Sequence, residues 1–473
     1  MIRGLLLSIF LLSQLSSNAQ EAWDIERCIT YAWENSLNIR QSMYGIELEK
    51  VNKQQSLAAR YPNLNGSTGL NLNFGRSLDE TTDAFTTQSI ITSNYGLTTG
   101  VLLWNAGRIK KNIQQSDLNL DAATNDVEQA KRDVALTIGT TYLNALFAEE
   151  NLSIVQNSLT LTKEQLVQID KLIAAGSRPR NERLDIVAQM SNDEQQIVAA
   201  ENNLAIAILN LKQLMNLDVE TSITLVAPPE TIFIETDPDN LSFGEVYAEA
   251  LKHQPNIQAG ESRLKSAELG VEIANTGKYP SIFANGNIGT AHSNRAKTIE
   301  GFSTVPVSSS VLINDAPSVI TTNQNIPNVV DQNYFGQLDG NLRYGLGLGA
   351  SIPIYDNYNT KANVQRAKLN VLTTQTQNDQ LHQTLKTNVQ QTLSDARAAK
   401  RALQASENTV DARKAAFENA EKRFNLGAIN TFEYVNAKNQ YDNSKVNYII
   451  SKYDYLFRSK IVDFYMGKSI TLD

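Results

Sequence analysis

The sequence predicts a duplicated α+β membrane protein in which each half of the chain contributes two transmembrane β-strands and long coiled-coil α-helices. The duplication is visible as repeated motifs: Tyr61 recurs as Tyr279, each followed by proline, and Gly176 recurs as Gly427. The second pair is further apart in the sequence than the first, so the second half carries an insertion. A long internal repeat indicates one structural unit that is used twice.

Residues 1–19 have the features of a secretory signal peptide. Arg3 gives a short charged start, an apolar run extends from Leu5 to Leu15, and small residues end at Ala19. A buried N-terminal helix is the alternative for this segment. No cysteine lies at the expected cleavage site, so we expect an exported protein without a lipid anchor. The chain then divides into a signal peptide (1–19), a first repeat (20–217), a linker (218–240), a second repeat (241–467) and a C-terminal tail (468–473).

The first helical segment of the mature chain is expected from about Asp24 to Arg60, because it has helical spacing and no proline. After it the period changes to two. Leu64, Leu70 and Phe74, for example, alternate with polar residues, most of them asparagines. Four segments behave in this way: 64–74, 95–103, 282–288 and 342–354.

The four alternating segments have the length and polarity of transmembrane strands. Each is about ten residues long, which is what a tilted strand needs to cross a bilayer. Arg343 is the one charged residue within them, and it falls on the polar side. An ordinary soluble sandwich sheet is the alternative. The segments that join the strands, from Arg76 to Asn94 and from Ala291 to Gly340, are expected to be loops, and the second is long and rich in Ser, Thr and Asn.

Each strand pair is followed by a very long helical segment. The first is expected between Gly107 and Gly176, the second between Tyr358 and Gly427, and the two intervals are equal in length and free of proline. A helix of this length would extend roughly 100 Å. Apolar residues recur every seven positions along both segments, which favours coiled-coil packing against partner helices. Gly176 and Gly427 are expected to end these helices as left-handed caps, with a returning helix after each.

Composition and charge exclude several classes of function. A net charge of −8 without a basic block argues against a nucleic-acid partner. Cys28 is the only cysteine, so no internal disulfide is possible, and its neighbours suggest a small core residue. The three histidines, His253, His292 and His382, are isolated in the sequence. We therefore expect that the protein is not an enzyme and that it has no metal site and no cofactor.

Four strands cannot close a transmembrane barrel, because the smallest bacterial examples have about eight. Three copies would supply twelve strands, so we expect a homotrimer with a twelve-stranded β-barrel that contacts outer-membrane lipid. Since the strands come in pairs, the helices of each copy leave the barrel on the same side. They would continue the tube as an α-helical barrel in the periplasm.

The stretch from Arg423 to Gly427, with Gln440, Tyr441 and Asp442, resembles the second hairpin tip of TolC-family outer-membrane efflux proteins. Ala32, Asn38 and Ile39 recur as Ala250, Asn256 and Ile257. This repeated pattern and the Tyr-Pro strand starts are similar to that family too, over essentially the whole mature chain. The resemblance implies an outer-membrane trimer that docks a periplasmic adaptor protein and an inner-membrane pump of the RND, ABC or MFS type. The first tip departs from the family pattern, since Arg178-Pro179-Arg180 replaces small apolar residues after glycine.

The resemblance implies that the hairpin tips form the periplasmic gate. Glu182 and Asp185 lie three residues apart on one helix face, and their counterparts in the second half are Glu433 and Asn436. Threefold symmetry would turn each carboxylate into a ring that favours cations. The family is acidic at both second-half positions, so Asn436 is a departure. An acidic first turn that complements the helix dipole is the alternative.

Arginines crowd the same tips, and we expect one or more of them to pair with a carboxylate of a neighbouring hairpin. These arginines are Arg178, Arg180, Arg183 and Arg423. For adaptor contact the family positions match Gly176, Ser177, Gly427, Ala428 and Thr431. The two glycines could alternatively be helix caps and nothing more.

The function expected from these observations is a passive exit duct for small molecules or exported protein, as part of a tripartite efflux or type I secretion system. Rows of Asn and Gly on one face of the strands favour a water-filled lumen. The alternative is a structural scaffold that spans the periplasm with the same coiled coils and conducts nothing.

Overall fold

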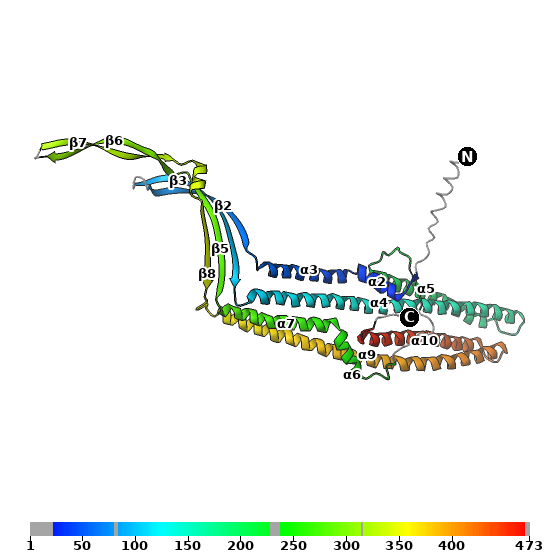
Figure 1. The fold of residues 1–473 in the computed structure, drawn as a ribbon. Helices are drawn as coiled ribbons and strands as arrows, with labels where there is room; N and C mark the ends of the chain where they lie inside the picture. Colours follow the sequence, from blue (N-terminus) through cyan, green and yellow to red (C-terminus); the bar gives the residue numbers. More distant parts are fainter. Residues whose placement is uncertain (1–21, 80–83, 228–236, 314–315, 469–473) are drawn as a thin grey trace, which may run out of the picture. The chain divides into compact units, whose positions relative to one another are not determined.

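The computed structural model describes residues 22–79, 84–227, 237–313 and 316–468, and Figure 1 shows the order of the elements. The expected signal peptide lies outside the described residues. The chain forms two compact units. Unit 1 contains the described parts of Met1–Lys50, Asp117–Ala267 and Asn370–Asp473, and unit 2 contains those of Val51–Ser116 and Glu268–Leu369.

Unit 2 is built on a four-stranded antiparallel sheet with the strand order β2-β3-β5-β8. Its strands are β2 (Asn63–Asp79), β3 (Ala84–Trp104), β5 (Ser281–Ser293) and β8 (Arg343–Ser351). The central pair, β3 and β5, joins a strand of the first half to a strand of the second half. Among the described residues, β2 and β8 each have one edge without a partner strand.

The period-two pattern of the sequence is confirmed by the register of this sheet. Leu97 lies opposite Ile288, and Ile288 lies opposite Tyr344, so the apolar residues of successive strands share one face. That face is exposed in the single chain: Leu346 is 94% exposed and Leu64 is 71% exposed. The other face carries Asn and Gly, as expected for alternation across a sheet.

The two joining segments of unit 2 were expected to be loops, and the structure corrects this. Most of the stretch from Arg76 to Asn94 continues the β2–β3 pairing, which extends to Asp79 opposite Ala84. Between Ala291 and Gly340 the chain forms an antiparallel hairpin of β6 (Lys297–Ile313) and β7 (Ala316–Asp331), followed by α8 (Tyr334–Gly340). Ser, Thr and Asn interrupt the aliphatic residues of both strands, so no regular alternation in the sequence predicts the hairpin.

Unit 1 consists mainly of helices, and four of its helices also contribute residues to unit 2. The helices are α2 (Ile25–Asn35), α3 (Leu37–Ala58), α4 (Arg108–Ala174), α5 (Glu182–Met215), α6 (Phe243–His253), α7 (Pro255–Asn275), α9 (Asn359–Asn425) and α10 (Thr431–Tyr465). The long helices α4 and α9 have 67 residues each, which confirms their expected length. Figure 1 shows α4 with α5, and α9 with α10, as two helical hairpins. Among the described residues, no helix combines the length and the apolar character needed to cross a membrane.

The first helical segment is interrupted, which the sequence did not reveal. Ser36 separates α2 from α3 and has extended backbone angles, and Gln254 separates α6 from α7 in the same way. These two positions are related by the same offset as Tyr61 and Tyr279, so the break belongs to the repeated unit. In both halves the amide of the break residue donates to the carbonyl four residues earlier, which closes the preceding helix.

The core of unit 1 near its first helix is closed by a short parallel pairing of β1 (Ala22–Trp23) with β4 (Thr224–Leu225). The Tyr142 hydroxyl lies 2.8 Å from the Trp23 carbonyl and 2.7 Å from the Val226 carbonyl, and it accepts the Val226 amide. Tyr142 is completely buried. Cys28 is buried in the same cluster, as expected, and burial raises the pKa of its thiol to about 12.

We expect Tyr142→Phe to lower the free energy of unfolding by about 1–3 kcal/mol, because it leaves buried backbone groups without their hydroxyl partner. Thermal unfolding followed by far-UV circular dichroism measures this effect. The matched control is Tyr44→Phe, since Tyr44 is 65% exposed on α3. That control should change the stability by less than about 0.5 kcal/mol. Equal shifts in the two variants would contradict the prediction.

Candidate functional site

The two helical hairpins of unit 1 end in tips with the same backbone geometry. Gly176 and Gly427 have φ angles of 72° and 77°, which confirms the expected left-handed caps. The Ser177 amide donates to the Leu172 carbonyl at 2.9 Å, and Ala428 repeats this bond with Arg423 at 2.8 Å. This is the capping pattern in which the residue after the left-handed glycine satisfies a free carbonyl of the last turn.

The side chain of Arg178 joins the two tips. It donates to the backbone carbonyls of Phe424 at 2.8 Å and Ile429 at 3.0 Å, both in the second hairpin. Its guanidinium also forms an ion pair with Glu182 at 3.3 Å, and both side chains are largely buried. Thr431 completes the group, because its hydroxyl donates to Glu182 Oε2 at 2.8 Å. The first tip is therefore bound to the second through buried polar contacts.

The residues predicted for the gate fall into two groups. Glu182 is buried between the hairpins, whereas the other five are exposed: Asp185, Arg183, Glu433, Asn436 and Arg423. Arg183 pairs with Asp170 at 2.8 Å, within its own hairpin. Among the tip arginines, Arg178 contacts the neighbouring hairpin, and it donates to backbone carbonyls there rather than to a carboxylate.

The residues predicted for adaptor contact are also divided by burial. Gly176, Ser177, Gly427 and Ala428 are exposed at the tips, and Thr431 is completely buried. Apolar side chains that the sequence did not single out are exposed beside them. These are Leu184, Leu426 and Phe432, with exposed fractions of 66%, 84% and 70%.

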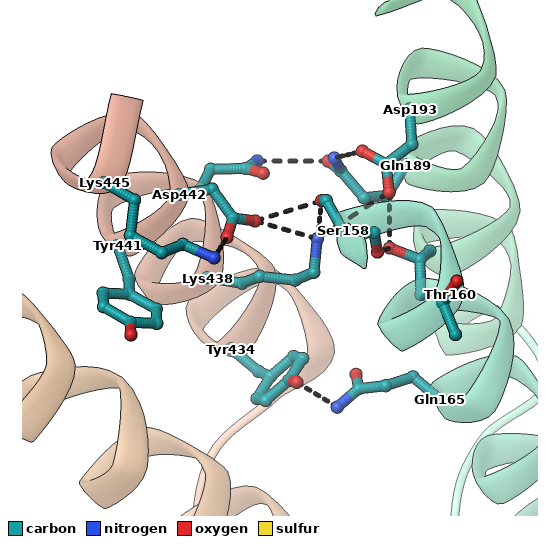
Figure 2. A network of polar contacts seen from close by, with 12 residues as sticks. Ser158, Thr160, Gln165, Gln189, Asp193, Tyr434, Lys438, Tyr441, Asp442 and Lys445 are labelled. Atoms are coloured by element: carbon teal, nitrogen blue, oxygen red, sulfur yellow. Dashed lines mark hydrogen bonds and ion pairs between the residues drawn. The ribbon is translucent and has the colours of Figure 1, made fainter. Parts of the chain in front are cut away.

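A buried lysine lies where α10 meets the first hairpin (Figure 2). Lys438 is 1% exposed and forms ion pairs with Asp442 at 3.1 Å and with Asp193 at 3.7 Å. Asp442 lies on α10 and Asp193 lies on α5, so the lysine bridges the two hairpins. Lys445 pairs with the other oxygen of Asp442 at 2.7 Å. Two cations and two carboxylates therefore meet, and the ion cluster is formally neutral.

Neutral side chains satisfy the remaining bonding capacity of this cluster. Ser158 of α4 accepts from Lys438 and donates to Asp442 at 3.0 Å. Gln189 donates to Asp193 at 2.7 Å and accepts from Asn439 at 3.1 Å. A buried ion pair tolerates desolvation only when its other donors and acceptors are also bonded. The hydrogen bonds around Lys438 meet this condition.

The electrostatics of the cluster keep Asp442 ionised. Burial would raise the pKa of this carboxyl group, but Lys438 and Lys445 outweigh that effect, and the pKa lies below its ordinary value. Towards the tip, burial raises the pKa of Tyr434, whose hydroxyl is bonded to Gln165 of the first hairpin. At neutral pH the Asp442 carboxyl group is therefore ionised and the Tyr434 phenol is neutral.

Sequence reasoning missed the buried cluster. The spacing of Lys438 and Asp442, four residues apart on a helix, was a usable signal for an ion pair. Nothing local connects either residue to Asp193, which lies in the other half of the chain. The described residues hold no group of three or more His, Cys, Asp or Glu side chains that could bind a metal ion.

Comparison with known proteins identifies the family. The model of the outer membrane efflux protein family matches residues 29–217 and 246–467, which is most of both repeats. The chain belongs to the outer membrane efflux protein family. Its location is accordingly the outer membrane, with the helical part in the periplasm. No curated protein sequence matches the chain.

Solved structures share the fold at low sequence identity. CusC matches with a TM-score of 0.74 and 16% identity, over 93% of this chain and 91% of that chain. The Campylobacter jejuni CmeC outer membrane channel matches with a TM-score of 0.71 and 18% identity, over 95% and 87%. Vibrio cholerae VceC matches with a TM-score of 0.72 and 13% identity, over 94% and 96%. The duplicated α+β fold expected from the sequence is confirmed by these likenesses.

We expect Lys438→Met to lower the free energy of unfolding by about 3–5 kcal/mol, because it leaves Asp193 buried without a charged partner. The matched control is Lys445→Met, since Lys445 is partly exposed and Asp442 keeps Lys438. This control should cost less than about 1 kcal/mol. Both are measured by chemical denaturation of the purified protein. Adding Asp193→Asn to Lys438→Met should recover part of the loss, and a double variant no more stable than Lys438→Met would contradict the prediction.

Proposed function

We propose that this protein is a trimeric exit duct of the outer membrane, which passively conducts small molecules or exported protein that a periplasmic adaptor and an inner-membrane pump deliver. The observation that carries this proposal is the four-stranded sheet, which has one open edge on β2 and one on β8 among the described residues. A transmembrane sheet must close on itself, and bacterial barrels have at least about eight strands. Three copies would supply twelve.

The chemistry of the sheet faces supports a conducting role. One face carries exposed apolar side chains from all four strands, which suits lipid. On the other, Asn285 and Asn287 lie over Gly347 and Gly345, where an added Cβ would lie 3.0 Å from each Asn oxygen. Glycine thus leaves room for a row of amides, which suits a water-filled lumen. Solved structures of the same fold are described as outer membrane channels, among them CmeC and the open state of Neisseria gonorrhoeae MtrE.

We expect the detergent-extracted protein to have the native mass of a trimer, because a single chain leaves two strand edges unpaired in the membrane. Native mass spectrometry or light scattering coupled to size exclusion measures this directly. The same preparation should conduct ions in planar bilayers. A stable monomer would contradict the duct, and a trimer that conducts nothing even with a loosened gate would favour a periplasmic scaffold.

The gate of this duct is proposed to lie at the hairpin tips. Within one chain, the Arg178–Glu182 pair and Thr431 hold the tips together. Between chains, the side chains available to meet a neighbouring copy are the exposed ones: Asp185, Glu433, Asn436, Arg183 and Arg423. Since an exposed ion pair contributes only about 0–1 kcal/mol, several must act together to keep the tips closed.

The adaptor is proposed to contact the exposed part of the same tips. Gly176, Ser177, Gly427 and Ala428 offer small side chains and backbone, and Leu426 and Phe432 offer apolar surface next to them. Thr431 contributes through its bond to Glu182, since its own side chain is buried. The pump could be of the RND, ABC or MFS type.

We expect Arg183→Ala and Arg423→Ala to raise channel conductance, with a larger increase when they are combined, because each removes one exposed charge from the closed tips. Single-channel recording in planar bilayers measures the effect. Lys163→Ala is the control, since Lys163 is exposed on α4 at a distance from the tip. Unchanged conductance in the double variant would show that these arginines do not keep the gate closed.

A further inference from the structure

The hairpin of β6 and β7 has two chemically different faces. Residues opposite one another in an antiparallel pair point to the same face. On one face, every pair between Ser303 and Ser309 of β6 contains one aliphatic residue. These pairs are Ser303–Ile326, Val305–Gln324, Val307–Thr322 and Ser309–Ile320. We call the surface formed by Val305, Val307, Ile320 and Ile326 the aliphatic face.

From Thr304 to Ser308 the opposite face is mostly polar and largely bonded within the hairpin, and beyond this stretch it carries the exposed side chains of Phe302 and Val319. Thr304 donates to Asn325 at 2.8 Å, and the hydroxyls of Ser308 and Thr321 lie 3.0 Å apart. The side chains of the aliphatic face cannot form such bonds, and Val305 and Ile320 remain 40% and 42% exposed. Exposed aliphatic residues repeated along one face of a long hairpin indicate a surface that another surface covers.

The edges of the hairpin are protected against strand addition. Proline has no amide hydrogen, so it is accommodated in a hairpin where the amide would point away from the partner strand. Pro306 lies on β6, and Pro317 and Pro327 lie on β7. Along the register their pairs are separated by even numbers of residues, so all three backbone nitrogens point to the same side relative to the partner strand, which must be the outer side. Each therefore removes a donor from an outer edge, which discourages edge-to-edge pairing. The partner must then meet a face of the hairpin.

The lack of charge on the hairpin limits the kinds of surface that it could bind. Between Glu300 and Asp331 the sequence contains a single charged residue, Asp315, which lies outside the described residues. A lipid phosphate or an acidic or basic protein surface would require complementary charges, and the residues of the aliphatic face are all neutral. Identical copies of a charged surface would repel one another, whereas identical neutral aliphatic surfaces can associate.

The place of the hairpin in the chain favours a second copy as its partner. The hairpin is inserted between β5 and β8, and β8 is the edge strand of the sheet. In the proposed trimer, this edge is where the next copy pairs. The two strands have 17 and 16 residues, so the hairpin extends roughly 50 Å. In the proposed trimer, hairpins of this length are long enough to meet those of neighbouring copies.

We propose that the aliphatic faces of three neighbouring copies pack together around the threefold axis, so that the hairpins form an apolar cluster at the outer end of the duct. This inference rests on the trimer of the proposed function. The cluster gives a role in assembly to the insertion that distinguishes the second half of the chain from the first.

Single cysteines on the two faces test this packing. Val307→Cys places a thiol on the aliphatic face, and Ser308→Cys places one on the polar face at the next position of the same strand. The only native cysteine, Cys28, is completely buried and does not interfere. With a mild oxidant, Val307→Cys should give at least several-fold more disulfide-linked dimer than Ser308→Cys, on non-reducing gels of the full-length membrane-embedded protein.

Trimer stability and native mass provide two further readouts. Val307→Glu should lower the temperature at which the trimer dissociates, and Ser308→Glu should leave it unchanged. Native mass is measured on the same samples. If the wild-type protein is a trimer and Val307→Cys crosslinks no better than Ser308→Cys, the proposed packing of the hairpins is wrong, but the proposed duct is not contradicted. If the wild-type protein is a monomer, the duct and the hairpin cluster both fail.

Discussion

The unpaired edges of β2 and β8 are the constraint on which the proposed architecture depends. Inside a bilayer no water is available to bond free amide and carbonyl groups, so an open strand edge is strongly unfavourable. One chain supplies four strands to this sheet and, among the described residues, leaves two of its edges open. The proposed trimer follows from this backbone requirement. Only in such an assembly would the apolar face of the sheet contact lipid and the amide-lined face surround a lumen.

The duplicated halves differ where they meet. The helices α4 and α9 have the same length of 67 residues, and both tips have the same glycine cap. The contact residues nevertheless diverge: Arg178 of the first tip occupies the position that Ile429 occupies in the second. Likewise Lys438 lies in the second hairpin, and its partner Asp193 lies in the first. Divergence of the two copies has thus produced complementary surfaces, which hold the hairpins of one chain together.

This complementarity shapes the expected behaviour of the tips. The buried contacts of Arg178 and Lys438 lie within one chain, whereas the exposed charges at Asp185, Glu433 and Arg423 are available to face other copies. Buried ion pairs are costly to break, and exposed ones are weak. Opening of the proposed gate is therefore easier between chains than between the two hairpins of one chain.

Local pattern by itself determined the strands, the long helices and their glycine caps, because alternation, heptads and left-handed glycine each depend on neighbouring residues. It did not determine the break at Ser36, because no proline follows this residue as Pro255 follows Gln254 in the second half.

Local pattern also missed the β6–β7 hairpin, because Ser, Thr and Asn interrupt its aliphatic residues and no regular alternation marks the two strands. The burial of Glu182 and Thr431 and the pairing of Lys438 with Asp193 were decided by tertiary structure alone. These residues come from different hairpins, and only the packing of α4, α5 and α10 removes them from water and fixes their partners.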